Sequence, residues 1–103
     1  MSHTPHRLDQ THAAELSDVL LGVDGVDSLH SGRYGQIALL FPGARYPGLT
    51  QRTNDNDDQR LEIHIVVTKD ALSDLEGVAQ RCREIASTYV SGAIDVTIAD
   101  VAA

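Results

Sequence analysis

Apolar residues alternate along the stretch Gln59-Arg-Leu-Glu-Ile-His-Ile-Val-Val-Thr68, and this alternation is the main clue to the fold. One side of the extended chain carries Leu61, Ile63, Ile65 and Val67. The other side carries Glu62, His64, Val66 and Thr68. A period of two residues is typical of a strand with one dry face and one mostly wet face.

A helical pattern and a second alternating strand follow this stretch. Apolar residues then recur three and four positions apart between Leu75 and Val90, which predicts a long amphipathic helix. Ser73 and Glu76 match a capping box, so we expect Ser73 to cap that helix. The segment Ala93–Ala99 alternates again. Two strands joined by a helix should be parallel if they are adjacent in the sheet.

The residues before this stretch predict a first helix and several short strands. We expect a helix from Asp9 to Leu21, ended by a glycine, a short strand within Val23–His30 and another within Gly48–Thr53. The apolar run Gln36–Phe41 fits either a strand or one helical turn. Short links between these strands favour antiparallel pairing.

The predicted fold class is α+β, with one small mixed β-sheet of four to five strands and two helices packed on one face. The expected element order is α-β-β-β-β-α-β. Residues 1–8 are expected to form a flexible N-terminus, and residues 9–101 a single domain. The chain has 103 residues, which fits one domain.

Composition and charge argue against several functional classes. The net charge of -7 disfavours nonspecific binding to nucleic acid or to anionic membranes. Aromatic residues make up only 4% and Trp is absent, so base-stacking platforms are not expected. The longest apolar run, Ile37–Phe41, is far shorter than the ~20 residues of a membrane span. We therefore expect a cytoplasmic protein without a membrane span.

Single residues give no catalytic or metal-binding constellation, and we expect no metal and no cofactor. Glu62 and His64 share one strand face, but a zinc site needs three or four ligands, and no HxxxH or CxxC pair supplies the others. The acidic segment Asn54–Asp58 does not match a calcium-binding EF-hand loop, because Arg60 stands where the loop counted from Asp55 needs Gly. We interpret this segment as a hairpin tip.

Cys82 is the only cysteine, which excludes an intramolecular disulfide. It lies within the apolar stripe of the long helix, so we expect it to be buried and unreactive. The glycines of Ser31–Gly35 do not have the spacing of a phosphate-binding loop.

A segment without acidic residues is the one unusual feature of the sequence. No Asp or Glu occurs between Ser28 and Asn54, although the chain has 15 acidic residues. Two Arg-Tyr pairs lie in this segment, and Arg and Tyr are enriched where proteins bind proteins. The alternative is a set of solvated turns whose arginines pair with nearby acids. Our candidate partner-binding residues are His30, Arg33, Tyr34, Arg45 and Tyr46.

Over residues 10–101 the chain resembles the alkaline-shock, or envelope stress response, family of Gram-positive bacteria. The resemblance depends on Gly22-Val-Asp-Gly-Val-Asp-Ser-Leu-His-Ser-Gly-Arg-Tyr-Gly35, on the strand Leu61–Val67 and on the closing Ile-Asp-Val-Thr-Ile strand. Ser31 stands where the family usually has glycine, and the proline usual near the start of the long helix is absent.

The resemblance implies a non-enzymatic cytoplasmic protein with a role in cell-envelope homeostasis, held at the inner membrane face by an anchored partner. It adds no catalytic residues. Protein partners, including copies of the same chain, are the expected ligands. Two alternatives remain open from the sequence: an RNA-binding α+β domain, and a small-molecule or metal-dependent enzyme using Glu62 and His64.

Overall fold

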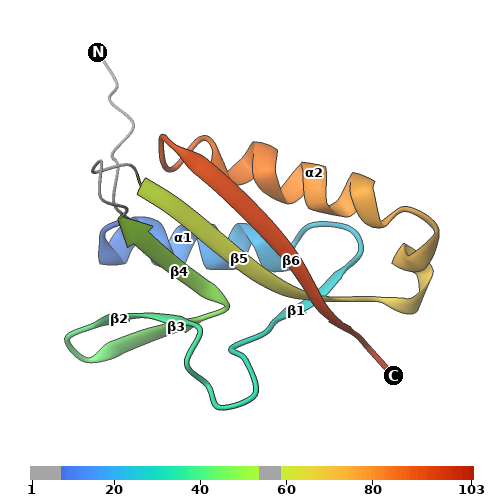
Figure 1. Cartoon of the computed structure of the whole chain (residues 1–103), viewed down its shortest axis with the longest axis horizontal. Helices are drawn as coiled ribbons and strands as arrows, with labels where there is room; N and C mark the ends of the chain where they lie inside the picture. Colours follow the sequence, from blue (N-terminus) through green and yellow to red (C-terminus); the bar gives the residue numbers. More distant parts are fainter. Residues whose placement is uncertain (1–7, 54–58) are drawn as a thin grey trace.

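A computed structural model describes residues 8–53 and 59–103, and it shows a mixed sheet with both helices on one side (Figure 1). The elements in chain order are α1 (Gln10–Leu21), β1 (Val26–Leu29), β2 (Ala38–Phe41), β3 (Ala44–Pro47), β4 (Leu49–Thr53), β5 (Gln59–Val67), the 3-10 helix η1 (Lys69–Ser73), α2 (Leu75–Ala86) and β6 (Ala93–Val101). The predicted α+β class is confirmed.

Strand β5 is the centre of the main sheet. Both β1 and β4 pair with it antiparallel along the same edge, where β1 lies beside Ile65–Val67 and β4 beside Gln59–Ile63. On its other edge β5 pairs with β6 in parallel, with Ile63 opposite Val96. The parallel pair across the helical connection and the antiparallel pairing of the earlier strands are therefore confirmed.

The first helix follows the sequence prediction. The Asp9 side chain accepts a hydrogen bond from the His12 amide at 2.8 Å, which caps the helix as an N-cap residue does. Leu8 was assigned to the flexible N-terminus, but it is buried, and its amide donates to the Gln51 side chain at 2.9 Å. The domain therefore includes Leu8, and residues 1–7 lie outside the described part.

The second helix begins and ends differently from the prediction. Ser73 belongs to η1, and it is the Asp74 side chain that accepts from the Gly77 amide at 3.2 Å, so the predicted Ser73 cap is wrong. The helix ends at Ala86 and does not continue to Val90, and the two residues that follow it are Ser87 and Thr88. Their hydroxyls donate to main-chain carbonyls three residues back, each at 2.7 Å, and such bonds compete with the helix pattern.

The apolar run after residue 36 forms a strand, β2, and the chain turns back into an additional strand, β3. The two pair antiparallel as a separate sheet, with Phe41 opposite Ala44. The two residues between them are Pro42 and Gly43, and Gly43 has a φ of 76°. A type II turn requires a positive φ at its second central residue, and proline is common at the first.

The core between the sheet and the helices is aliphatic. Residues with less than 2% of their surface exposed include Leu16, Leu20, Leu49, Leu61, Ile63, Ile65, Val67, Val78 and Cys82. The inward face of β5 is therefore the one predicted from its alternation. Among the described residues, none of the buried ones is polar or charged.

Candidate interaction surface

The segment from His30 to Pro47 leaves the main sheet and projects from the body of the protein; we call it the arm (Figure 1). His30, at the start of the arm, and Gly48, directly after its end, both bond to one residue of β5. The His30 amide donates to the His64 carbonyl at 2.8 Å, and the His64 amide donates to the Gly48 carbonyl at 2.8 Å. The arm is thus fixed where β1 ends and β4 begins.

Further contacts order the arm along its length. The Ile37 amide donates to the Ser31 carbonyl, and the Gly48 amide donates to the Ile37 carbonyl, both at 2.8 Å. Phe41 and Tyr46 meet edge to face with ring centroids 5.9 Å apart, and both pack against the core. Tyr46, one of the predicted partner-binding residues, therefore holds the arm to the body.

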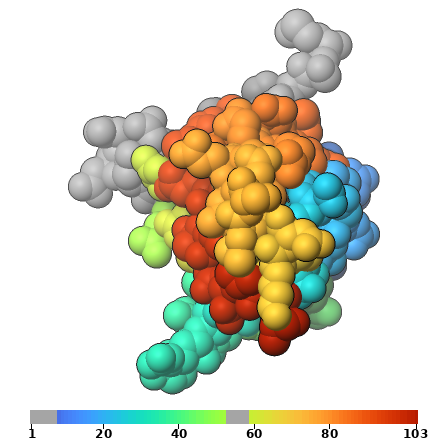
Figure 2. Space-filling view, turned by 90° about the vertical axis from the view of Figure 1, so that its right-hand side faces the viewer, coloured from blue at the N-terminus to red at the C-terminus, as the bar shows by residue number. Residues whose placement is uncertain are grey.

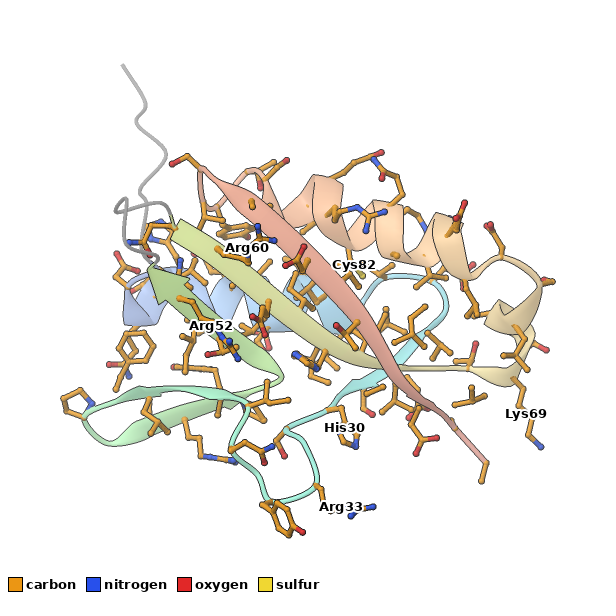
Figure 3. All side chains as sticks on the ribbon, in the orientation of Figure 1. His30, Arg33, Arg52, Arg60, Lys69 and Cys82 are labelled. Atoms are coloured by element: carbon orange, nitrogen blue, oxygen red, sulfur yellow. The ribbon has the colours of Figure 1, made fainter. Side chains whose placement is uncertain are left out.

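A tight turn at Gly32–Gln36 presents Arg33 and Tyr34 to solvent. The Gly35 amide donates to the Gly32 carbonyl at 3.2 Å, and the Gly32 amide donates to Nδ1 of His30 at 3.0 Å. Tyr34 is 83% exposed. Figure 3 shows Arg33 at the end of this loop and His30 at its base. The space-filling view in Figure 2 shows the same loop standing out from the body.

Arg45 extends from β3 toward this turn, and its guanidinium donates to the Gly35 carbonyl. Within residues 8–53 and 59–103, no carboxylate forms an ion pair with Arg33 or Arg45. The alternative in which these arginines are satisfied by nearby acids therefore has no support in the described part of the chain. The acid-free sequence thus corresponds to a projecting, cationic surface.

Leu40 is a residue of this surface that the sequence analysis did not select. It is 73% exposed, because β2 alternates and turns Leu39 toward the core and Leu40 outward. The alternation could have identified it once β2 was known to be a strand. We define the arm surface as Arg33, Tyr34, Leu40 and Arg45; of the other predicted residues, His30 lies at the base of the arm and Tyr46 against the core.

The outward face of the main sheet carries a network of charged side chains. Glu62 lies 3.1 Å from Arg52 and 3.6 Å from Nε2 of His64. Asp95 accepts a hydrogen bond from Arg60 at 2.5 Å, and this pairing raises the pKa of Arg60. Figure 3 labels Arg52 and Arg60. In the described ranges, no three His, Cys, Asp or Glu side chains are grouped closely enough to hold a metal ion.

Two further features of the fold are a buried thiol and a surface groove. Cys82 is fully buried, and desolvation raises the pKa of its thiol, as expected for an unreactive cysteine in apolar surroundings. A shallow groove of about 750 Å³ lies between the end of α1 and α2, lined largely by Val19, Val23, Ile85 and Tyr89.

Comparisons of this chain with protein-family models, with curated proteins and with solved structures find no match. In the part of the chain that the structure describes, no helix is long and apolar enough to cross a membrane.

Proposed function

We propose that this chain is a non-enzymatic protein-interaction domain, and that it acts in cell-envelope homeostasis through self-association and a membrane-anchored partner. The observation that carries the proposal is the arm surface. It combines two arginines, which form no ion pair within residues 8–53 and 59–103, with the exposed side chains of Tyr34 and Leu40. These residues lie on a projecting segment that backbone hydrogen bonds fix to the sheet. The role in the envelope follows the resemblance to the alkaline-shock family.

The composition of the arm surface favours binding to a protein. Tyr and Arg are the residue types most often found among the few that dominate binding energy. Burying an exposed leucine or tyrosine side chain contributes on the order of 2 kcal/mol. An acidic chain with one cationic projection should attract a partner that presents carboxylates around an apolar pocket.

The attachment of the arm reduces the cost of binding. Hydrogen bonds at His30, Ile37 and Gly48 hold its base, and the pair of Phe41 and Tyr46 packs it against the core. A surface that is already ordered loses little conformational entropy when a partner binds.

Affinity capture from native cell extract tests this proposal. The variant R33A/Y34S/L40S removes three exposed side chains and leaves the contacts of Arg45 and Tyr46 in place. We expect this variant to capture at least about tenfold less of the membrane-anchored partner than the unchanged chain does, because a hot-spot residue contributes about 2 kcal/mol to binding. Recovery in the membrane fraction should fall in parallel.

The matched control is L72S, which removes an exposed apolar side chain from η1, outside the arm. It should bind as the unchanged chain does. Circular dichroism should show that all variants remain folded. Equal capture by the arm variant and the unchanged chain would refute the proposed surface, and salt-sensitive capture of RNA instead would favour the nucleic-acid alternative.

A further inference from the structure

Strand β6 has one free edge. It pairs with β5 along one side, and no other strand in the described ranges pairs with its opposite side (Figure 1, red). The strand has nine residues, which is long compared with an average of about five or six. A free edge presents unpaired amide and carbonyl groups, which can pair with another chain.

Residues 93–98 of β6 carry few of the features that usually protect a free edge, whereas Asp100 and a register irregularity lie beyond them. The strand contains no proline and no lysine, the residues that most often block edge-to-edge pairing. Asp95 lies on the outward sheet face, where it bonds to Arg60. The one irregularity in the pairing with β5 falls after Ile98, so that residues 93–98 form a regular strand.

The sequence of β6 is nearly symmetric about Val96. It reads Ala93-Ile-Asp-Val-Thr-Ile-Ala99, with apolar residues at matching positions in both directions. If two copies pair antiparallel around Val96, then Ile94 faces Ile98 of the second copy, and Asp95 faces Thr97. The threonine hydroxyl can donate to that carboxylate, and no like charges meet.

The inward face of β6 also has apolar surface left to bury. Ile94, Val96 and Ile98 are only half-buried, unlike the fully buried side chains of the neighbouring strand β5. A second copy placed alongside would extend the sheet and cover their outer sides. Such a contact between identical surfaces closes with twofold symmetry and does not propagate.

We propose that two copies of this chain associate through their β6 strands, antiparallel about Val96, to form one continuous sheet. This inference rests on the self-association in the proposed function and gives it a geometry. The arm joins the main sheet at the opposite edge, formed by β1 and β4. The dimer therefore carries its two arms at the far edges of the sheet, where it can engage two partner molecules at once.

Opposite substitutions at Thr97 test both the interface and its register. Thr97 is exposed and lies beside His64 on the outward face, so that either charge is compatible with the folded monomer. T97D places an acid opposite Asp95 of the second copy at two symmetric positions, and should raise the dimer Kd about tenfold. T97K places a positive charge opposite Asp95 of the second copy at the same two positions and should lower the dimer Kd.

The double variant D95T/T97D exchanges the two residues and should restore dimerisation. Sedimentation equilibrium from about 1 to about 500 µM covers the affinities expected for a small interface. If T97D and T97K shift the Kd in the same direction or leave it unchanged, pairing about Val96 is wrong. A wild-type chain that stays monomeric throughout refutes the β6 dimer.

The result separates the two proposals. If substitutions at Thr97 leave the dimer Kd unchanged but R33A/Y34S/L40S abolishes dimerisation, then the chain self-associates through the arm and not through β6. If the chain is monomeric but still captures the membrane-anchored partner, the proposed arm surface is supported and the proposed β6 dimer is refuted.

Discussion

Gly48 and His64 approach so closely that Gly48 has no room for a side chain. The His64 amide donates to the Gly48 carbonyl at 2.8 Å, and a Cβ atom on Gly48 would lie 3.0 Å from the His64 carbonyl oxygen. It would also lie 2.6 Å from Cβ of Leu29. This close approach is what allows the arm to return to the sheet beside the residue from which it departs.

We expect G48A to destabilise the fold by at least about 2 kcal/mol, because it combines a strained positive φ with a clash against rigid neighbours. G43A is the matched control. Gly43 also has a positive φ, of 76°, but nothing lies within 4 Å of its Cβ position, so only the conformational cost of about 1 kcal/mol applies. Urea unfolding followed by circular dichroism measures both, and equal losses would show that the contact with β5 does not matter.

The two neighbouring residues Ser73 and Asp74 should differ in their effect on α2. D74A removes the carboxylate that accepts from the Gly77 amide, and should lower the free energy of unfolding by about 1 kcal/mol. D74N keeps an accepting oxygen and should lose only a fraction of this. S73A should be close to neutral, since the Ser73 hydroxyl donates to the Asp70 carbonyl within the short helix η1 and does not cap α2. A larger loss in S73A than in D74A would contradict the observed cap.

The two tyrosines of the Arg-Tyr pairs should also behave differently. Y46A removes a ring that packs on Phe41 and on the core, and should cost about 1–3 kcal/mol of stability. Y34A removes a side chain that is 83% exposed, and its stability should stay within about 0.5 kcal/mol of the unchanged chain. Thermal unfolding of the two variants measures this difference. The prediction is wrong if Y34A is less stable than Y46A.

Cys82 should make stability fall at alkaline pH. Burial raises the pKa of its thiol in the folded chain above the value of the unfolded chain. Above about pH 8.5 the unfolded chain loses this proton while the folded chain keeps it, so the free energy of unfolding decreases as the pH rises. The contribution is complete at lower pH and is lost as the pH rises toward the folded-state pKa.

The variant C82A isolates this effect, because it lacks the titrating group. Its stability should decline less steeply above pH 8.5 than that of the unchanged chain, although it is lower at neutral pH because the core loses packing. Chemical denaturation between pH 7 and pH 10 gives both slopes. Rapid reaction of native Cys82 with a thiol reagent would contradict its burial.

Local sequence patterns predicted most of the secondary structure and part of the candidate interaction surface. The alternation of β5 and the helical spacing of α2 identified the buried faces, because both depend only on which residues are apolar and how far apart they lie. The cap of α2 was placed one residue too early, since Ser73 and Asp74 both suit a cap and η1 determines which one is used. Exposed Leu40 was missed, because the run Gln36–Phe41 does not reveal whether it is strand or helix.

The amino-acid sequence was enough to predict the α+β class, the inward face of β5 and the burial of Cys82, and it shows directly that no acids surround the Arg-Tyr pairs. These properties follow from residue type and spacing along the chain. The tertiary structure was needed to show that β1 and β4 share one edge of β5 and that Tyr46 packs inward while Tyr34 points outward. It was also needed to show that no strand of the described ranges pairs with the outer edge of β6. Each of these depends on pairing between residues far apart in the sequence, which a local pattern does not encode.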